Sequence, residues 1–477
     1  MKILMLNPPF LPKFSRQSRS PCVSKGGNLY YPYYLSYATG ALEKAGFKPT
    51  LIDAVAKGWS HKDVVHFTEH FRPDLVVLDT STPSIFNDVE VASKIKQSVS
   101  DTHVCLVGTH PTNLTEKTFK ISEHIDSICR GEYDYTIVDL AHTIDEGKPL
   151  DSIQGLSFRK GKKIKHNKPR PLIKNLDELP FVSDVYKRHL NIEDYFYASV
   201  RHPEVTILTA RGCPFSCSFC PIMFKGSYRV RSVENVVDEF EYIQNELPEV
   251  KEVMIEDPTF PVSKKRTIEL CNLMIKRKIQ LHWSCNARVD VDEETLKKMK
   301  EAHCRLMCVG FESPVQRVLD SVHKRTTKRL QLDCMRKARK VGILVHGCFI
   351  FGLPKDTKQT IRETIEFAKQ LNPDTAQFYP MMIYPGTEAY EWAKRNGYLE
   401  TENFSKWLHE DGTMATTVNR PELPSRVLEE YCILAKKSYY LRLSYLFPKF
   451  FQMIMNPAEA LRTLKSFKVF WKYILKI

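Results

Sequence analysis

Cys213-Pro-Phe-Ser-Cys217-Ser-Phe-Cys220 places three of the thirteen cysteines within one short stretch. The preceding run, residues 205–210, is apolar and rich in β-branched residues, which predicts a strand. Arg211-Gly212 then turns the chain, and the glycine supplies the backbone freedom that a tight ligand loop requires. Downstream, Ser232 is suited to cap a helix. The pattern predicts a cysteine loop at the C-terminal end of a strand, where α/β folds place their chemistry.

Closely spaced thiolates are soft ligands that suit an iron–sulfur cluster or zinc. Three cysteines leave one iron of a four-iron cubane without a protein thiolate, and an open coordination position can hold a substrate. A closed zinc site would need a fourth Cys or His, which no nearby residue supplies at finger spacing. A disulfide framework is not expected in a long chain without a secretion signal. We therefore predict a cluster on this loop, with zinc as the alternative.

The spacing CxxxCx(aromatic)C, with Phe219 in the aromatic slot, resembles the signature of the radical S-adenosylmethionine enzymes. The resemblance implies that Cys213, Cys217 and Cys220 are the catalytic, metal-binding residues that hold a [4Fe–4S] cluster. In that family the open iron chelates the amino and carboxylate groups of S-adenosylmethionine. One electron then cleaves the sulfonium, giving methionine and a 5′-deoxyadenosyl radical that abstracts hydrogen. The other ten cysteines show no second such spacing, so one cluster is predicted.

Length and composition indicate a globular chain of several domains. The chain has 477 residues, 43% of them hydrophobic, which suffices for two or three domains with their own cores. No apolar run reaches the ~18 residues of a membrane-spanning helix. The apolar residues 1–6 end at Asn7-Pro-Pro9, too early for a signal peptide. We expect a reducing cytoplasm, which fits cysteines that serve as ligands or small buried groups.

Residues 1–145 read as strands that alternate with helices. Apolar runs suited to buried parallel strands lie at residues 2–7, 49–53, 75–79, 104–107 and 126–129, and helices are expected at 33–45 and 88–97. The alternation predicts a doubly wound, Rossmann-like α/β sheet with its ligand crevice at the C-terminal strand ends. The loops at those ends are Asn7-Pro-Pro-Phe10, Thr80-Ser-Thr-Pro-Ser84, Gly108-Thr-His-Pro-Thr112 and Arg130-Gly-Glu-Tyr133.

These four loops resemble those of the cobalamin-binding domain in one large class of radical S-adenosylmethionine enzymes. The resemblance implies that residues 1–145 bind cobalamin through Asn7, Pro8, Ser81, Thr82, Ser84, Gly108, Thr109, His110, Gly131 and Glu132. The DxHxxG motif of base-off, His-ligated cobalamin proteins is absent. The alternative is a domain that has lost its cofactor and remains as scaffold.

His110 is not expected to be a metal ligand. A lone histidine is more often a capping or hydrogen-bonded side chain. The small residues Gly108 and Thr109 are better candidates, because a corrin face needs close backbone approach.

Residues 146–200 read as a connector that carries a basic hairpin turn, Arg159-Lys-Gly-Lys-Lys163. The βα alternation then resumes over residues 201–400. Strands are predicted at residues 205–210, 252–257, 281–287, 305–311, 344–350 and 375–381. Six such units predict a partial (β/α)6, TIM-like barrel whose functional residues lie at the strand ends.

Several strand-end side chains suit the groups of S-adenosylmethionine. Arg288 offers a guanidinium suited to a carboxylate, and Glu312 can accept hydrogen bonds from an ammonium or a hydroxyl. Val309-Gly-Phe-Glu-Ser313 and Phe349-Ile-Phe-Gly-Leu-Pro354 resemble the family's motifs on strands four and five. The resemblance implies S-adenosylmethionine contacts at Phe219, Glu256, Asp257, Arg288, Glu312, Ile350 and Tyr379. The alternatives are a structural ion pair for Arg288 and Glu312, and plain barrel core for residues 349–351.

Residues 401–477 form a helical, basic and aromatic C-terminal region. The net charge is +14, and the segment from Lys436 to the end has nine Lys or Arg and one acidic residue, Glu459. Its aromatic residues alternate with lysines at Phe450, Phe451, Phe467, Phe470, Trp471 and Tyr473. This pattern suits the interface of an anionic membrane, and the alternative is a helix that packs its aromatic residues on the barrel. The stretch Tyr439-Tyr-Leu-Arg-Leu-Ser-Tyr445 resembles C-terminal regions of cobalamin-type radical enzymes, including the hopanoid-modifying branch.

The sequence therefore predicts a cobalamin-dependent radical S-adenosylmethionine enzyme, resembling the hopanoid-modifying and Mg-protoporphyrin ester cyclase group. It would methylate, or rearrange, cyclise or couple, an unactivated carbon of a hydrophobic substrate such as a lipid or isoprenoid. The resemblance implies an electron donor such as flavodoxin or ferredoxin. The tail suggests peripheral contact with the inner face of the membrane. The rival class is a nucleic-acid-modifying or nucleic-acid-binding protein, but the positive charge concentrates in a tail rich in bulky apolar residues, which favours a lipid surface.

Overall fold

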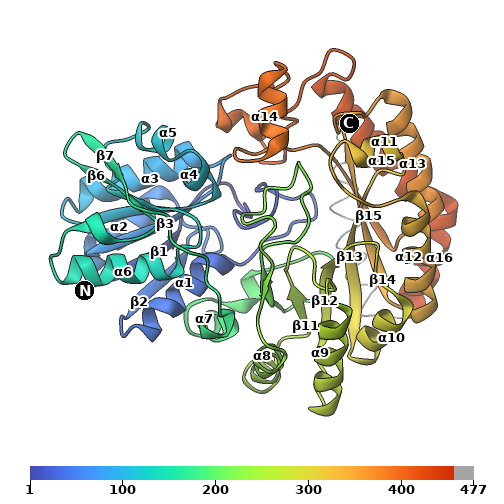
Figure 1. Cartoon of the computed structure of the whole chain (residues 1–477), viewed down its shortest axis with the longest axis horizontal. Helices are drawn as coiled ribbons and strands as arrows, with labels where there is room; N and C mark the ends of the chain where they lie inside the picture. Colours follow the sequence, from blue (N-terminus) through green and yellow to red (C-terminus); the bar gives the residue numbers. More distant parts are fainter. Residues whose placement is uncertain (456–477) are drawn as a thin grey trace. The chain divides into compact units, whose positions relative to one another are not determined.

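The computed structural model of the chain describes residues 1–455, which form two compact units (Figure 1). The first unit contains residues 1–24, 28–195 and 403–415. The second contains residues 25–27, 196–402 and the described residues from Thr416 onward. Each unit is built on its own largely parallel sheet with helices against it, so the predicted α/β class is confirmed.

The first unit holds a seven-stranded sheet of order β2-β1-β3-β4-β5-β6-β7. Its five parallel strands match the predicted ones: β1 (Ile3–Asn7), β2 (Pro49–Asp53), β3 (Leu75–Thr80), β4 (His103–Gly108) and β5 (Ser127–Cys129). The antiparallel hairpin of β6 (Leu156–Lys160) and β7 (Lys163–His166) extends the sheet, and its turn lies in the predicted basic stretch. The strand order reverses between β1 and β3, and such a reversal opens a crevice at the C-terminal strand ends.

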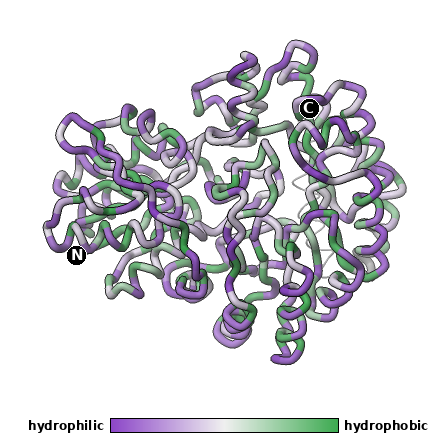
Figure 2. The backbone as a smooth tube through the Cα atoms, viewed as in Figure 1, coloured by the Kyte–Doolittle hydropathy of each residue, from purple (hydrophilic) through white to green (hydrophobic). Residues whose placement is uncertain are grey.

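Helices cover both faces of this sheet because its central strands are apolar on both sides (Figure 2). One face packs on α1 (Tyr33–Lys44), α6 (Asp134–Asp145) and α7 (Val182–His189) around a core that includes Met5, Val77 and Cys105. The other face is covered by α3 (Ile85–Ser98), which contacts β3, β4 and α2 (His61–Phe71). The short helices α4 (Thr109–Asn113) and α5 (Thr115–Phe119) follow β4.

The second unit holds a six-stranded parallel sheet whose strands follow chain order, β15-β14-β13-β12-β11-β8. The strands are β8 (Glu204–Ile207), β11 (Glu252–Ile255), β12 (His282–Ala287), β13 (Cys304–Glu312), β14 (Leu344–Phe351) and β15 (Thr375–Pro380). The intervening helices are α8 (Val233–Glu246), α9 (Lys264–Lys276), α10 (Glu293–Glu301), α11 (Gln316–Asp320), α12 (Lys328–Val341) and α13 (Lys358–Leu371). Six βα units in sequential order are the predicted partial barrel.

The C-terminal helices close the open edge of this sheet. After α14 (Glu388–Arg395) come α15 (Ser425–Tyr440) and α16 (Leu443–Met455). The hydroxyl of Tyr440 bonds both the amide and the carbonyl of Ala376 on β15, and the hydroxyl of Tyr445 donates to Asp374. An edge strand exposes unpaired backbone groups, so these tyrosines protect β15 from pairing with other chains. The tyrosine-rich stretch of the sequence thus packs on the barrel.

Candidate functional site

The loop that carries the three cysteines is anchored by Asp257, which follows β11. Its carboxylate accepts hydrogen bonds from the amides of Thr209 (2.7 Å) and Ala210 (3.1 Å) and from the hydroxyl of Thr209 (2.5 Å). A two-stranded ladder, β9 (Ala210–Arg211) with β10 (Arg229–Val230), then closes the base of the loop. Asp257 therefore fixes the backbone from which the loop departs, rather than standing free at a strand end.

Gly212 is required at the start of the loop. Its φ is +79°, and a Cβ at this position would lie 1.7 Å from the carbonyl oxygen of Ser227. A larger residue would force the two ends of the loop apart.

The three cysteines form no disulfide and are partly exposed on one loop. The amide of Cys220 donates to the carbonyl of Cys217 (3.2 Å), and the Lys225 ammonium bonds that carbonyl as well (2.9 Å). Among residues 1–455, no group of three or more His, Cys, Asp or Glu side chains is close enough to hold a metal ion. The donor set of three accessible thiols on one loop nevertheless fits an iron–sulfur cluster, because thiolates are its protein ligands.

Arg288, just after β12, packs against this loop. Its guanidinium lies 3.8 Å from the ring centroid of Phe215, inside the cysteine stretch. One of its terminal nitrogens donates to the carbonyl of Lys324 (2.8 Å), while its Nε has no hydrogen-bond partner and lies 3.6 Å from Asp290. Arg288 therefore connects the cysteine loop to the turn after α11.

Glu312 ends β13 in a strained conformation. Its φ is +61°, in the left-handed region that non-glycine residues rarely adopt. Its Oε1 accepts from the ammonium of Lys324 at 2.7 Å, and its Oε2 is buried without a hydrogen-bond partner. Gly310 makes room for the pair, because a Cβ there would lie 2.4 Å from Oε1. Such strain costs about 1–3 kcal/mol and clusters at ligand sites.

The ion pair considered from the sequence, Arg288 with Glu312, does not form. Glu312 pairs with Lys324, which sequence reasoning missed, and both side chains are more than nine-tenths buried. The basic stretch His323-Lys-Arg325 looks like solvated surface, and nothing in it distinguishes Lys324.

The remaining candidates divide between the two faces of the sheet. The rings of Phe349 and Phe351 pack against Phe311 and Phe378 in the core. These rings are therefore part of the barrel core, which was the alternative to a contact with S-adenosylmethionine. Ile350 lies on the opposite face, in register with the partly exposed Tyr379. Glu256, at the end of β11, accepts from the side-chain amide of Asn286 (3.2 Å). Phe219 is partly exposed in the cysteine loop.

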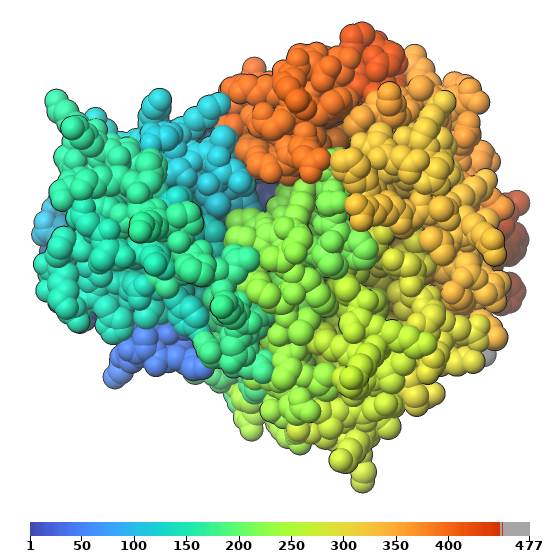
Figure 3. All heavy atoms as spheres, viewed as in Figure 1, coloured from blue at the N-terminus to red at the C-terminus, as the bar shows by residue number. Residues whose placement is uncertain are grey.

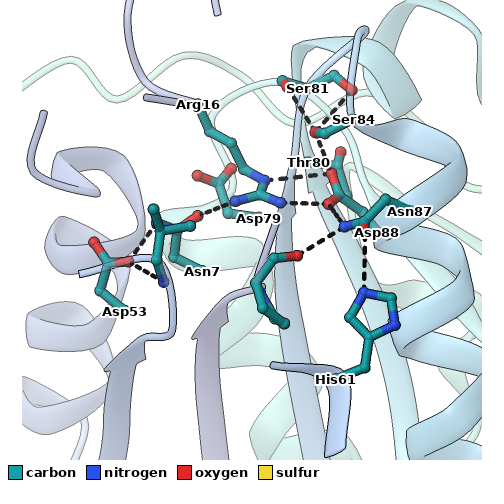
Figure 4. Close-up of polar contacts among 12 residues, drawn as sticks. Asn7, Arg16, Asp53, His61, Asp79, Thr80, Ser81, Ser84, Asn87 and Asp88 are labelled. Atoms are coloured by element: carbon teal, nitrogen blue, oxygen red, sulfur yellow. Dashed lines mark hydrogen bonds and ion pairs between the residues drawn. The ribbon is translucent and has the colours of Figure 1, made fainter. Parts of the chain in front are cut away.

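In the first unit, the candidate cobalamin residues lie at the strand ends, and several of them form hydrogen bonds with neighbouring protein groups. Asn7 donates to Asp53 (2.8 Å) and accepts from Arg16 (3.0 Å), beside the buried Pro8. The hydroxyl of Ser84 bonds Ser81 (2.7 Å) and Asp88 (2.5 Å). These contacts, drawn in Figure 4, fix the loops that follow β1 and β3.

The loops after β4 and β5 are fixed in the same way. The amide of Gly131 donates to Thr112 (3.1 Å), and Glu132 accepts from the amide of Ile173 (2.9 Å). Thr109 begins α4 and is partly exposed.

Packing within the first unit explains why His110 and Gly108 occupy their positions. The His110 ring is buried and lies 3.3 Å from the Thr82 hydroxyl and 4.9 Å from the ring of Phe404, and burial lowers its pKa to about 3. Gly108 has φ +120°, and a Cβ would lie 2.3 Å from the carbonyl oxygen of Thr80. A glycine at position 108 is therefore already required by the close packing of the backbone against strand β3, whether or not a corrin also approaches it.

Three further polar residues at this edge escaped the sequence analysis. Arg16, from the long loop after β1, is 5% exposed and forms an ion pair with Asp88 (2.6 Å). Gln17 donates to Asp79 at the end of β3, and burial raises the pKa of Asp79 to about 7. The sequence signal that could have identified Asp79 is its position, because it is a carboxylate at the end of the apolar run Leu75-Val-Val-Leu-Asp79.

Comparison with known proteins places both units in families. Residues 207–368 match the Radical SAM superfamily, and residues 20–141 match the B12 binding domain. An uncharacterized methyltransferase of Pyrococcus horikoshii is 33% identical over 93% of both chains. The chain belongs to the cobalamin-binding class of radical S-adenosylmethionine enzymes. Its cofactors are a [4Fe–4S] cluster, S-adenosylmethionine and cobalamin, as the sequence predicted.

Other relatives of this enzyme differ in reaction. The anaerobic magnesium-protoporphyrin IX monomethyl ester cyclase of Cereibacter sphaeroides is 30% identical over 84% of this chain and 66% of its own length. The hopanoid C-3 methylase of Methylococcus capsulatus is 24% identical over 85% and 76%. Among solved structures, the methyltransferase TsrM of Kitasatospora setae, with cobalamin and a [4Fe–4S] cluster bound, shares the fold with a TM-score of 0.69, 19% identity and coverage of 92% and 88%. In residues 1–455, no helix is both long and apolar enough to span a bilayer.

Proposed function

We propose that this enzyme transfers a methyl group to an unactivated carbon of a hydrophobic substrate. The observation that carries the proposal is the similarity along nearly the whole chain to a protein named as a methyltransferase. When bound, the cluster supplies the electron that cleaves S-adenosylmethionine reductively, and cobalamin supplies a carrier for the methyl group.

The cysteine loop and the strand ends of the second unit are assigned to the cluster and to S-adenosylmethionine. Cys213, Cys217 and Cys220 hold the cluster on the backbone that Asp257 anchors. The unpaired Oε2 of Glu312 accepts a hydrogen bond from an ammonium or a hydroxyl of S-adenosylmethionine, and Lys324 holds the carboxylate in place.

The other contacts proposed in this unit have less specific geometry. The guanidinium of Arg288, whose Nε has no hydrogen-bond partner and lies 3.6 Å from Asp290, is assigned to the carboxylate of S-adenosylmethionine. The remaining proposed contacts are Phe219, Glu256, Ile350 and Tyr379.

Cobalamin is assigned to the strand ends of the first unit. A crevice forms where strand order reverses, between β1 and β3. The proposed contacts are Asn7, Pro8, Ser81, Thr82, Ser84, Gly108, Thr109, His110, Gly131 and Glu132. Several of these side chains already bond to protein groups, Ser81 to Ser84, Thr82 to His110 and Asn7 to Asp53, so backbone atoms of these loops are proposed to face the corrin. The pKa of His110 lies near 3, so its imidazole is neutral, and its ring packs as a structural group.

The second candidate function is rearrangement, cyclisation or coupling of the substrate radical. It is favoured by the cyclase that is 30% identical to this chain. Both reactions use the same cofactors and the same residues, so the site geometry supports them equally.

An isotope experiment separates the two candidates. The enzyme is reconstituted anaerobically with iron, sulfide and hydroxocobalamin, and incubated with a lipid extract, a flavodoxin reductant and S-adenosylmethionine deuterated in its methyl group. Methyl transfer gives a product that carries the labelled methyl, whereas cyclisation or rearrangement gives 5′-deoxyadenosine and an unlabelled product. Flavodoxin or ferredoxin is the proposed physiological donor, and a dithionite control tests the need for a protein donor.

A membrane-surface substrate is proposed from the C-terminal helices. Five side chains of residues 441–451 are large, apolar and exposed: Leu441, Leu443, Leu446, Phe447 and Phe451. Part of this segment is visible in dark red at the surface of the second unit in Figure 3. Phe467, Phe470, Trp471 and Tyr473 of the predicted tail lie outside the described residues. We infer a cytoplasmic enzyme in peripheral contact with an anionic membrane, because exposed apolar groups beside a basic segment suit such a surface.

A further inference from the structure

A row of polar side chains crosses the sheet of the first unit where the strand order reverses. Asn7 on β1 is in register with Asp53 on β2, and Asp79 on β3 follows Leu78, the partner of Leu6. We call Asp53, Asn7 and Asp79 the polar row. Below it, the same face of the same strands is apolar core, including Met5, Leu51 and Val77. The polar row therefore caps that core at the crevice end of the sheet.

The hydrogen bonds of the polar row are complete except at one atom. Asp53 accepts from Asn7 (2.8 Å) and the Val55 amide (3.0 Å) with one oxygen, and from the Tyr195 hydroxyl (3.1 Å) with the other. Asn7 is bonded through both its amide nitrogen and its oxygen.

Asp79 is different. Its Oδ2 accepts from Gln17, while its Oδ1 has no partner, although the residue is 1% exposed. In Figure 4, Asp79 lies beside Arg16, between Asn7 and the Ser81–Ser84 loop.

An unsatisfied buried oxygen of this kind destabilises the fold. The nearby cation does not offset it, because Arg16 is bonded to Asp88 and Asn7 rather than to Asp79. Burial and the neighbouring Asp88 carboxylate raise the pKa of Asp79 to about 7, so near neutrality the group can both donate and accept a hydrogen bond. Unsatisfied buried groups call for an explanation, and a bound ligand is one.

We propose that Asp79 is a cobalamin-binding residue whose Oδ1 pairs with a primary carboxamide on the edge of the corrin. The inference rests on the corrin site assigned above to the first unit. A primary carboxamide carries both an N–H donor and an oxygen acceptor, so it satisfies Asp79 in either protonation state. Gln17 holds the other carboxylate oxygen and thereby fixes the direction in which Oδ1 points. Asp79 thus selects a carboxamide at one position of the corrin edge.

The first test measures retention of hydroxocobalamin by the full-length, cluster-reconstituted chain. Asp79→Leu keeps the branched shape of the side chain and removes both oxygens, and we expect the Kd to rise by about ten-fold or more. Asp79→Asn offers a carboxamide in place of the carboxyl and should restore most of the affinity. Asp53→Asn is the matched control, since Asp53 belongs to the same row and has no unsatisfied oxygen. A Kd for Asp79→Leu equal to that of wild type, with the fold intact by circular dichroism, would overturn the proposal.

The second test uses the wild-type chain and does not depend on the folding of Asp79→Leu. The monocarboxylic acids of cobalamin, one for each of its primary carboxamides, each carry one carboxylate in place of a peripheral carboxamide. At pH 8, where Asp79 is mostly ionised, one of them should bind at least about ten-fold more weakly than cobalamin, because its carboxylate meets the Asp79 carboxylate. That loss should disappear in Asp79→Asn, whose amide can donate to the carboxylate. Equal binding of all these acids, or a loss that persists in Asp79→Asn, contradicts the proposal.

The binding data distinguish an error in the assigned corrin site from an error in the role of Asp79. If the wild-type chain holds no hydroxocobalamin at all, the assigned corrin site is wrong. If wild type binds and the variants and analogues show no dependence on residue 79, the site stands and the role of Asp79 is wrong.

Discussion

The strand ends of the two sheets differ in how many of their polar groups already have hydrogen-bond partners within the protein. In the first unit the strand order reverses, and polar side chains at the C-terminal strand ends bond to one another, leaving Oδ1 of Asp79 unsatisfied. In the second unit the strands follow chain order, and the candidate groups are presented on a loop and on a strained strand end. The three thiols of the loop are partly exposed, and the Nε of Arg288 and the Oε2 of Glu312 have no hydrogen-bond partner.

This difference follows from what each cofactor requires. A metal cluster binds through side-chain sulfurs, so the loop must keep its thiols accessible. A large macrocycle needs loops that are held in fixed positions, and a network of buried hydrogen bonds gives that rigidity. We therefore expect single substitutions to act on one unit without disturbing the other.

The largest expected effect is on the cluster. Cys217→Ala removes one of three thiolates and should abolish the iron–sulfur absorbance and the reductive cleavage of S-adenosylmethionine, because the remaining thiols are too few to hold the cluster. Retention of hydroxocobalamin should be unchanged. Cys271→Ala, which alters a buried cysteine on α9, is the control and should keep the absorbance. A normal iron–sulfur spectrum in Cys217→Ala would show that the loop is not the cluster site.

The next effect is on the stability of the first unit. Asp88→Asn leaves the buried guanidinium of Arg16 without its counter-charge, which costs about 3–5 kcal/mol. The control is Glu90→Gln on the same helix, which breaks an exposed pair with Lys94 and costs about 0–1 kcal/mol. Chemical unfolding followed by limited proteolysis should show loss of the first unit at lower denaturant in Asp88→Asn only. Equal midpoints for the two variants would contradict the buried ion pair.

A smaller effect is expected on binding of S-adenosylmethionine. Glu312→Gln leaves the buried Lys324 ammonium unpaired and removes the accepting carboxylate, so affinity should fall by about ten-fold or more. Glu301→Gln, in an exposed pair with Lys298 on α10, should leave affinity unchanged. Equilibrium dialysis with the reconstituted protein measures both, and iron content confirms that the cluster is present. If affinity is retained in Glu312→Gln, the strained conformation at the end of β13 serves structure alone.

Asp79 should make the stability of the first unit depend on pH. Its pKa is raised to about 7, so the folded chain keeps a proton that the unfolded chain loses above its ordinary pKa of about 4. The contribution of this group to stability therefore falls as the pH rises from about 4 to 7 and is constant above that. Asp79→Asn removes this dependence and should be more favourable relative to wild type at pH 8 than at pH 5. Urea midpoints that shift equally at both pH values would argue against a raised pKa.

The fold and the cluster loop could be predicted because their signals are local. Apolar runs mark the strands, and the spacing of Cys213, Cys217 and Cys220 marks the loop. The parts that were missed depend on contacts between residues far apart in the chain. In the sequence, Lys324 is indistinguishable from a solvated lysine, and only the fold shows that it pairs with Glu312 at the end of β13. In the same way, only the fold shows that Gln17 donates a hydrogen bond to Asp79.

The roles of individual side chains depend on the same distant contacts. Asp257 is predicted to contact S-adenosylmethionine because it ends a strand, and in the structure its oxygens accept hydrogen bonds from the backbone that leads into the cysteine loop. Sequence shows which residues lie at a strand end, but it does not show which of them already have hydrogen-bond partners.

The smallest expected effect concerns the C-terminal segment, and the structure determines where the chain can be cut. Truncation before Ser438 would remove Tyr440 and Tyr445, which protect the edge strand β15, so it would damage the barrel itself. A chain that ends at Met455 keeps those contacts and loses Arg462, Lys465, Lys468, Lys472 and Lys476.

Each lysine near an anionic bilayer is worth about 1 kcal/mol, and the attraction weakens in salt because the Debye length shrinks to ~3 Å at 1 M. The full chain should therefore bind phosphatidylserine vesicles at low salt, and the chain ending at Met455 should bind them much less while keeping its cluster and its corrin. Replacing the exposed Phe447 and Phe451 by Ser tests the apolar part separately, and should weaken binding at all salt concentrations. If the full chain and the shortened chain sediment equally with vesicles, the membrane contact is absent, and the search for the substrate returns to molecules free in solution.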